Sequence, residues 1–219
     1  NSVRGIHAGG VEPTNVIQYI TIATTGDSAD FGDLTQARTQ LSSISDGHGG
    51  LEAYDPRLIP LGSGRGLVMG GDLGPAFTNT IEFIQINTLG NGTDFGNLTA
   101  TTIQGSACTS PTRCILGGGK TPTLLNVIES IEMHSKGNCA DFSDLSQTRS
   151  RLGSLSSSTR GVWGSGGTPS NSDVMDYVTI TTAANASDFG NLTVARIAAM
   201  GGGSSTRGEF GGGYTPSNQ

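Results

Sequence analysis

A unit of 47 residues recurs along this chain and constrains its fold more than any single residue does. The most constant part of the unit is a five-residue segment, Asp-Phe-Gly/Ser-Asp/Asn-Leu, which begins at Asp30, Asp94, Asp141 and Asp188. Successive copies are 64, 47 and 47 residues apart. Units of this length that show no helical pattern cannot bury a core alone, so neighbouring units must pack against one another.

An arginine precedes each glycine-rich segment and keeps the same spacing. This first arginine series is Arg4, Arg65, Arg113, Arg160 and Arg207. From the second unit on, the next arginine follows the aspartate of Asp-Phe by 19 residues, whereas in the first unit the distance is 35. We assign the 16 additional residues to an insertion at about 47–63, which holds Tyr54, Asp55 and Arg57. Because insertions in repeat arrays map to loops on one face, we expect this segment to be a contact loop.

The composition favours short strands joined by tight turns. Glycine supplies 35 of 219 residues and only 14% of the chain is charged. Apart from a brief stretch at 34–41, no window has the 3.6-residue apolar period of a helix. We therefore predict one all-β domain over 1–219, with units at 4–64, 65–112, 113–159 and 160–206 and a partial fifth unit at 207–219.

The fourth unit serves as a template for the strands. Arg160 to Trp163 and Val174 to Thr181 are predicted strands, and the second is the stronger because it is rich in β-branched and aromatic residues. Thr193 to Ala198 is a further predicted strand, and the glycine-rich segment from Gly201 to Ser205 is a predicted turn. The segments equivalent to the strongest strand are 16–22, 80–86 and 127–133. Three or four short strands per unit are the content of one β-propeller blade.

Each copy of the strongest strand carries one polar residue near its middle. These residues are Gln18, Glu82, Glu129 and Asp176. They fall on a face that is otherwise apolar, so a buried carboxylate there needs a partner. A second arginine series lies eight residues after the aspartate of Asp-Phe, at Arg38, Arg149 and Arg196, with Thr102 as the exception. We predict ion pairs from the acidic residues to arginines on neighbouring strands or units.

The aromatic residue of the constant segment is the main apolar anchor of each unit. It stands at Phe31, Phe95, Phe142 and Phe189, and a leucine follows it three residues later in every copy. Together with the arginine series and the acidic residues, these positions are the expected structural residues of the repeat.

Charge and hydropathy exclude two classes of partner. The net charge is -6 and no basic cluster is present, so we expect no nucleic-acid partner. No apolar run approaches the roughly 18 residues of a membrane-spanning helix, so we expect no membrane insertion. The first residues, Asn1 to Arg4, resemble neither a signal peptide nor a natural start, and we expect the chain to be a processed or partial piece of a longer protein.

The three cysteines leave two interpretations open. Cys108 and Cys114 flank predicted strands and could form a disulfide, or they and Cys139 could be small buried residues. Their spacing is not that of a metal site.

Few residues offer chemistry. The histidines, His7, His48 and His134, occupy three different positions of the unit and need not converge, so we expect neither a metal nor a cofactor there. Asp30 with Asp33 has the spacing of oxygen ligands for calcium, but two of the other copies replace the second acid by asparagine, which favours turn chemistry. We expect no catalytic residues and no enzymatic activity.

The unit resembles a kelch-type propeller blade. The features that carry the resemblance are a glycine cluster after a short strand, an aromatic in the next strand (Tyr19, Phe83, Tyr177), the phenylalanine of the constant segment and a later arginine. The second aromatic is phenylalanine where kelch units have tryptophan, the 12-residue separation is longer than in kelch units, and Ser130 replaces the first aromatic in the third copy. The resemblance implies an array of about four kelch-like blades.

The whole unit also resembles repeats of virion structural and tail-fibre-like proteins of large aquatic, especially cyanobacterial, bacteriophages. The segments that carry this resemblance are 176–181, 185–196 and 205–208. It implies a place on a virus particle outside the cell, with other virion proteins or a host-surface glycan or receptor as partners. It transfers no catalytic residues.

Two questions stay open at the level of sequence. Four Asp-Phe segments are flanked by five arginine-glycine strands, so the array is either part of a larger ring or an open array whose edges invite strand pairing. The function is either that of a non-enzymatic virion protein for host attachment or particle assembly, or that of a secreted carbohydrate-binding propeller of cellular origin. Exposed aromatic residues such as Trp163, Tyr54 or Tyr214 would favour sugar binding.

Overall fold

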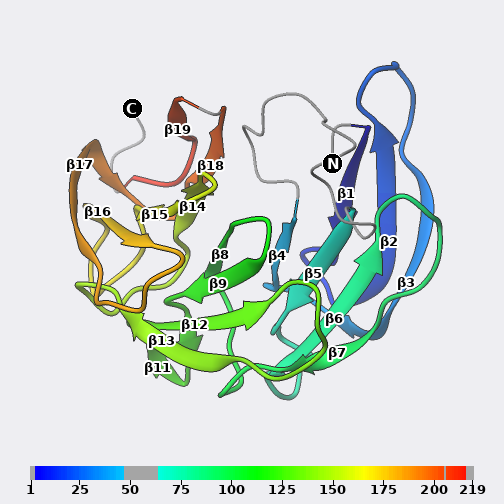
Figure 1. Ribbon diagram of the computed structural model, residues 1–219, viewed down its shortest axis with the longest axis horizontal. Helices are drawn as coiled ribbons and strands as arrows, with labels where there is room; N and C mark the ends of the chain where they lie inside the picture. The colour runs from blue at the N-terminus through cyan, green and yellow to red at the C-terminus, as the bar shows by residue number, and fades with distance from the viewer. Residues whose placement is uncertain (1–2, 47–63, 205, 216–219) are drawn as a thin grey trace.

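The computed structural model describes residues 3–46, 64–204 and 206–215, and every regular element in them is a β-strand. Five antiparallel sheets follow one another along the chain, here numbered I to V, and a short hairpin, β10 (Lys120–Thr121) with β11 (Thr123–Leu124), extends from sheet III. The all-β prediction is confirmed. In Figure 1 the sheets form an arc, and within the described residues sheet I and sheet V do not pair, so no closed ring is formed.

Sheets II, III and IV each have four strands. Sheet II contains β4 (Ser42–Ser45), β5 (Arg65–Met69), β6 (Thr80–Gln85) and β7 (Thr93–Asn97). Sheet III contains β8 (Ser106–Thr109), β9 (Arg113–Gly117), β12 (Val127–Glu132) and β13 (Ala140–Asp144). Sheet IV contains β14 (Gly153–Ser156), β15 (Arg160–Gly164), β16 (Ser172–Thr179) and β17 (Ser187–Arg196).

The two terminal sheets are incomplete by comparison. Sheet I has three strands, β1 (Arg4–Ala8), β2 (Thr14–Thr21) and β3 (Ala29–Arg38), which correspond to the second, third and fourth strands of the other sheets. Sheet V has two strands, β18 (Met200–Gly203) and β19 (Gly208–Gly211), which correspond to the first and second. The arginine that begins each unit in the sequence therefore opens the second strand of a sheet, or directly precedes it at Arg207.

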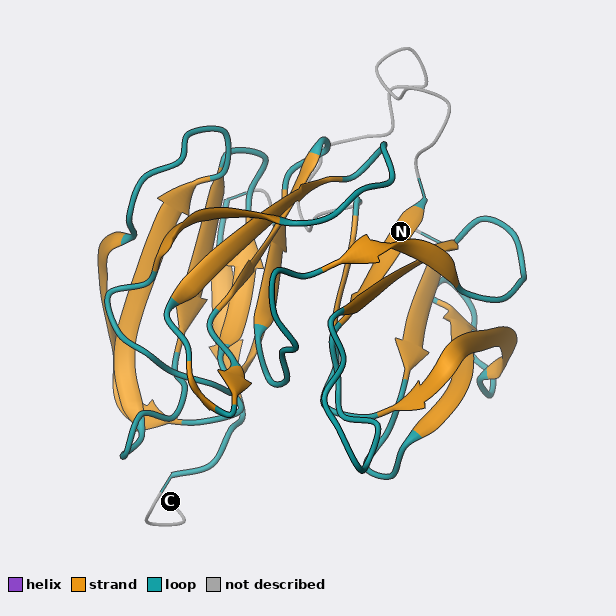
Figure 2. Ribbon diagram, turned by 90° about the horizontal axis from the view of Figure 1, so that it is seen from below, coloured by secondary structure: helices purple, strands orange, loops and turns teal. Residues whose placement is uncertain are grey.

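The first strand of each sheet lies on the inner side of the arc and the Asp-Phe strand lies on the outer side (Figure 1). Seen at right angles, the strands are joined by loops at both ends (Figure 2). Neighbouring inner strands are held by hydroxyl groups: Ser42 Oγ donates to Gly105 O at 2.6 Å, and Ser154 Oγ donates to Ala107 O at 2.8 Å.

One inner strand was predicted as a turn. The glycine-rich segment that begins at Gly201 is strand β18, which pairs with β19. Glycine is required because a Cβ atom at Gly201 would lie 2.0 Å from the carbonyl oxygen of Ser154. Close approach of two inner strands, and not a change of chain direction, explains this glycine.

The last strand of the unit also differs from its prediction in extent. Instead of an isolated strand at 193–198, β17 runs continuously from Ser187 through the Asp-Phe segment to Arg196, with a register shift opposite Met175 and Asp176. The residues after it turn into the inner strand of the next sheet.

A row of backbone hydrogen bonds runs from sheet to sheet at these turns. Gln104 N donates to Gln40 O, Arg151 N to Gln104 O, and Ala198 N to Arg151 O, at 2.8 to 3.0 Å. All four residues have φ between 54° and 59°, which is uncommon for residues other than glycine. The row fixes the spacing of successive sheets. The four residues share no side-chain type, so the sequence does not reveal the row.

The core consists of separate apolar layers between adjacent sheets. Phe31 and Leu34 of sheet I pack with Ile84 and Ile86 of sheet II. Phe95 and Leu98 of sheet II pack with Ile131 and Met133 of sheet III, and Phe142 and Leu145 of sheet III pack with Trp163 and Ile180 of sheet IV. Sheets II, III and IV thus each cover the forward face of the sheet before them, where "forward" denotes the face toward the next sheet in chain order.

Candidate functional site

Three arginines of the first series join their sheet to the next. Arg4 Nη1 donates to Ile86 O at 2.8 Å, Arg65 Nη1 to Met133 O at 2.8 Å, and Arg113 Nη1 to Ile180 O at 3.2 Å. The acceptor is in each case a carbonyl at the end of the third strand of the following sheet.

Guanidinium groups of the first arginine series also lie over aromatic residues of their own sheets. Arg4 lies 4.9 Å from the ring centre of Tyr19, Arg65 5.1 Å from that of Phe83, and Arg160 4.6 Å from that of Tyr177. Cation–π attraction holds the side chains extended toward the next sheet. The spacing that marked these arginines in the sequence thus reflects a connecting role.

The second arginine series forms the predicted ion pairs at two interfaces. Arg38 Nη2 lies 2.7 Å from Glu82 Oε1, and Arg149 Nη2 lies 2.5 Å from Asp176 Oδ2, with all four side chains fully buried. Arg38 is the last residue of β3, and Arg149 lies between β13 and β14. Each acid lies on the third strand of the following sheet.

Backbone groups satisfy much of the remaining hydrogen-bonding capacity around these pairs. Arg38 Nη1 donates to Gly70 O and Thr80 O at 2.9 and 3.0 Å, and Thr35 N donates to Glu82 Oε2 at 2.8 Å. Arg149 repeats the pattern with Ser165 O and Val174 O, and Ser146 N donates to Asp176 Oδ2. The pair and its carbonyl acceptors form one latch between two sheets.

Burial lowers the pKa of the Arg38 and Arg149 guanidinium groups, because removal from water disfavours the charged form. The neighbouring carboxylates Glu82 and Asp176 act in the opposite direction and favour the charged guanidinium. A guanidinium group stays protonated in proteins, so both arginines are charged near neutral pH.

The interface between sheets II and III has no arginine latch. Glu129 is buried and accepts from Thr99 N and Thr99 Oγ1, each at 2.8 Å. The prediction of an arginine partner is wrong for Glu129, because Thr102 occupies the place of Arg38 and Arg149. A threonine hydroxyl and a backbone amide supply the hydrogen bonds instead.

Gln18, the fourth member of the polar series, is exposed, and its Oε1 accepts from Ser28 Oγ at 3.3 Å. In the described residues no sheet precedes sheet I, so the position that is buried elsewhere faces outward here.

The residues on either side of the insertion are joined by hydrogen bonds to the buried carboxylate of Asp46. Asp46 accepts from Gly64 N at 3.0 Å and from Arg65 N at 3.1 Å, and Asp46 N donates to Arg65 O. In the other sheets a serine does the same for the arginine that opens the second strand: Ser110 for Arg113, Ser157 for Arg160 and Ser204 for Arg207.

The insertion therefore lies in the sequence between β4 and β5, the first and second strands of sheet II, whereas three residues, 110–112, join the same two strands in sheet III. The predicted contact residues Tyr54, Asp55 and Arg57 lie outside the described residues.

Of the two interpretations of the cysteines, the structure has the buried residues and not the disulfide. Cys108 and Cys114 are free and buried. Cys108 lies opposite Ile115 on β9 and packs in the layer toward sheet IV, whereas Cys114 packs in the layer toward sheet II. Their side chains thus point to opposite faces of sheet III, and burial raises the pKa of Cys108 to about 12.

Cys139 and Cys114 share the layer toward sheet II. Burial also raises the pKa of both thiols, and for Cys139 the adjacent carboxylate of Glu129 adds to the effect. Protonated thiols in these positions act as small apolar residues.

The other candidate ligands do not converge within the described part of the chain. No group of three or more His, Cys, Asp or Glu side chains there could hold a metal ion. Nor does that part contain a helix able to cross a bilayer. His134 Nε2 lies 2.8 Å from Pro111 O, and Asp188 accepts from Gly190 N at 2.8 Å within β17. His48 lies outside the described residues.

The exposure of the forward face of sheet IV was not predicted from the sequence, although the residues concerned are repeat residues that the sequence identifies. Phe189 is 47% exposed, whereas Phe31, Phe95 and Phe142 are 1 to 8% exposed. Met175, Leu192 and Arg196 are likewise only partly buried, while their equivalents in other sheets are buried. At the opposite end, Ile20 and Ile22 of sheet I are 48% and 57% exposed.

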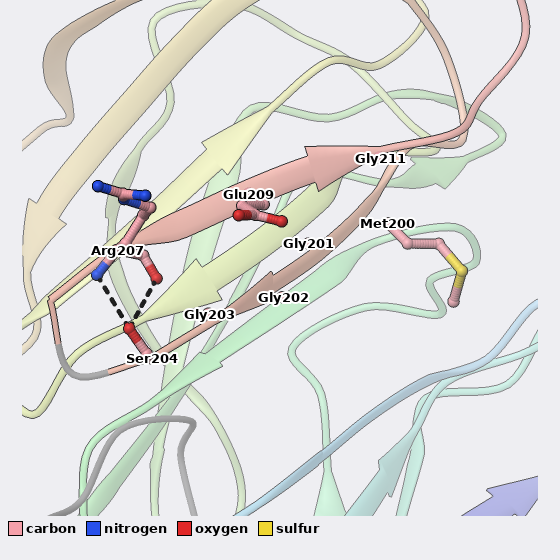
Figure 3. A pocket seen from close by; sticks show the side chains of 8 residues that line it. All are labelled: Met200, Gly201, Gly202, Gly203, Ser204, Arg207, Glu209 and Gly211. Atoms are coloured by element: carbon pink, nitrogen blue, oxygen red, sulfur yellow. Dashed lines mark hydrogen bonds between the residues drawn. The ribbon is translucent and has the colours of Figure 1, made fainter.

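A shallow hollow lies on the β18–β19 hairpin and is lined by Met200, Gly202, Arg207 and Glu209 among others (Figure 3). Glu209 occupies the place that Leu67, Ile115 and Val162 occupy in sheets II, III and IV, where these residues are buried. Alignment of the second strands alone would have revealed this replacement of an apolar residue by a charged one.

Comparison of the chain with models of protein families gives no match, and comparison with curated proteins gives none either.

Proposed function

We propose that this protein is a non-enzymatic structural or adhesion protein of a virus particle, in which a kelch-like propeller array of blades presents loops for host attachment or particle assembly. The observation that carries the proposal is the use of the repeat's charged residues between sheets. Two fully buried ion pairs show this use: Arg38 with Glu82, and Arg149 with Asp176. Side chains that could otherwise act on a substrate serve to connect sheets.

The place on a virion rests on the resemblance of the whole unit to repeats of virion and tail-fibre-like proteins of aquatic bacteriophages. Partners of such a protein are other virion components or a glycan or receptor on the host surface. The insertion at 47–63 is the part of the repeat that differs most between units, and its two ends are held by Asp46. A segment whose flanking residues are hydrogen-bonded to each other is suited to present a variable surface.

The alternative, a secreted carbohydrate-binding propeller, is less well supported by the aromatic residues. Trp163 is fully buried, and its indole Nε1 donates to Ser106 O at 2.8 Å, so it cannot stack on a sugar. Tyr214 is 58% exposed and remains available.

The experiment replaces the insertion and its anchor, Asp46, by the short connection found in sheet III. Residues 46–64 are replaced by Ser-Pro-Thr, the sequence that joins the same strands at 110–112 in sheet III. The serine retains the acceptor for Arg65 N, so the variant is expected to fold, which circular dichroism and thermal unfolding would verify.

Binding of labelled protein to cyanobacterial cells is then measured for the parent and the shortened variant, and the same chains are applied to a glycan array. Immunogold labelling of phage particles with an antibody against the chain tests location. A folded variant with at least tenfold weaker cell binding supports adhesion through the insertion. Absence of labelling on particles, with glycan binding that depends on Tyr214, would instead favour the alternative.

A further inference from the structure

We propose that the outer edge of β19, together with the exposed forward face of sheet IV, is a docking surface for a two-stranded segment that carries the third and fourth strands of this same repeat. A carboxylate in the first of these strands pairs with Arg196. This inference concerns assembly of the array and does not depend on a place on a virion.

Arg196 repeats half of a latch that is complete elsewhere. Its Nη1 donates to Gly212 O at 2.9 Å, as Arg38 Nη1 donates to Gly70 O and Arg149 Nη1 to Ser165 O. Arg38 and Arg149 have two further acceptors on the third strand of the next sheet, a carboxylate and the carbonyl two residues before it. Within the described residues, neither acceptor is present for Arg196.

Arg160 shows the same incompleteness. Its guanidinium lies over Tyr177, but in the described part of the chain it reaches no third-strand carbonyl of the kind that Arg4, Arg65 and Arg113 reach. A single third strand would supply the carboxylate for Arg196 and the carbonyl for Arg160. At the two interfaces that have an arginine latch, I/II and III/IV, one third strand supplies the carboxylate and the carbonyl in this way.

Backbone groups of the outer strand indicate a loop between the two docked strands. In sheet I, Phe31 O and Asp33 O accept from Gly90 N and Gly92 N, which lie in the loop between the third and fourth strands of sheet II. Phe95 O and Asn97 O accept from Gly137 N and Cys139 N in the same way. Phe189 O and Asn191 O are the equivalent acceptors of sheet IV.

A glycine leaves room for that loop. A Cβ atom at Gly96 would lie 1.7 Å from Gly137 O, and one at Gly32 would lie 2.5 Å from Gly90 O. Gly190 keeps the positive φ of 122° but the nearest atom to its Cβ position is the terminal methyl of Met175, at 3.8 Å. The space that the loop fills elsewhere is thus present and open.

Apolar contacts and strand order agree with this occupant. Phe189, Leu192 and Met175 are exposed or half-buried, whereas the third strand of the next sheet covers their equivalents. In the described residues β19 pairs only with β18. Its other edge is therefore free to pair with a third strand. Glu209 lies on the forward face of β19, not at this edge, so its charge does not oppose the added strand.

The test uses the chain's own third and fourth strands as the probe. Thr215 to Asn218 repeat the sequence of Thr168 to Asn171, so a copy of residues 173–196 appended directly after Gln219 continues the repeat in register. The extended protein is compared with the 219-residue parent by thermal unfolding. We expect the extended protein to have a thermal unfolding midpoint at least about 4 °C higher, because the docked strands add to the free energy of unfolding of a chain of this size.

The dependence on charge separates docking from a general effect of a longer chain. The gain should be largely lost when the appended copy of Asp176 is asparagine, or when Arg196→Gln is made in the parent sequence. Lys120→Gln, which removes the same charge from the exposed β10–β11 hairpin, is the matched control and should leave the gain intact. An unchanged midpoint, or a gain equal in the Arg196→Gln background, would overturn the proposal.

A second arm offers the same segment in trans. A fluorescent peptide of residues 172–196 should bind the parent saturably, with at least tenfold weaker binding to the Arg196→Gln protein. Sedimentation velocity of the parent without peptide tests the competing occupant, a second copy that docks through Gln18, Ile20 and Ile22 of sheet I. Dimers that are abolished by Ile20→Asp but unaffected by Arg196→Gln would assign the surface to that copy and overturn the proposal.

Discussion

The interface between sheets III and IV and the forward face of sheet IV are built from the same repeat positions, yet one is buried and the other is open. At the interface, Phe142 is 8% exposed and Arg149 is paired with Asp176. On the open face, Phe189 is 47% exposed and Arg196 contacts only carbonyl groups. The difference shows that the repeat specifies half of an interface, and that each half needs the next unit to become a core.

The largest expected effect of a single change is the loss of one partner from a buried latch. Glu82→Ala leaves Arg38 charged and without its counter-ion, because the guanidinium stays protonated near neutral pH. We expect a loss of about 3 to 5 kcal/mol in the free energy of unfolding, measured by urea titration. Arg196→Ala, at the open face, should cost less than about 1 kcal/mol, and equal losses would contradict the contrast between the two regions.

Truncation of the repeated phenylalanine should separate the regions next. Phe95→Ala removes a fully buried ring from the layer between sheets II and III, and we expect a loss of about 3 to 5 kcal/mol where the cavity stays open. Phe189→Ala should cost about 1 kcal/mol, since half of its ring is already in water. Thermal unfolding of both variants in the same buffer measures the ratio. If Phe189→Ala proved as costly as Phe95→Ala, the face would be covered in solution.

The buried thiol of Cys108 should make the interior sensitive to alkali. Its pKa in the folded protein is about 12, against 9.0 for the free thiol, so the folded state keeps a proton that the unfolded state releases. Stability from this group is complete below pH 9 and is lost as the pH rises toward 12. We expect a loss of about 1.4 kcal/mol between pH 8 and pH 10.

Urea titration of the reduced protein at the two pH values measures this loss, and Cys108→Ala provides the control. The difference between the parent and Cys108→Ala removes the contributions of the other thiols and of the arginines. A parent and a variant with the same pH dependence would show that the thiol is not buried as described.

The smallest effect is expected at an ion pair on the surface. Arg113 Nη2 lies 3.0 Å from Glu132 Oε1, but the two side chains are 30% and 51% exposed. Glu132→Ala should change the free energy of unfolding by less than about 0.5 kcal/mol, and less still in high salt. A cost comparable to that of Glu82→Ala would show that burial does not decide the value of these pairs.

Much of the candidate site followed from spacing alone. The arginine that reaches Glu82 or Asp176 was identified from its constant distance to Asp-Phe, and the polar residue in an apolar strand indicated that a partner was needed. Thr102 in place of an arginine showed in the sequence that Glu129 lacks an arginine partner. Its actual partner, Thr99, could not be predicted, because it depends on which backbone amide lies next to the third strand. The face to which each cysteine points depends on the pairing of β8 with β9, which spacing does not reveal.

By itself, the sequence determined the all-β class, the length of the unit, the residues that recur at its interfaces and the position of the insertion. These follow from periodicity, because identical units impose identical contacts wherever two of them meet. The tertiary structure alone decided that a sheet begins one strand before the arginine, that Gly201 belongs to a strand, and that the two ends of the array are exposed. These features depend on which neighbour is present beside each unit, and a residue's burial is a property of its neighbours and not of its position in the repeat.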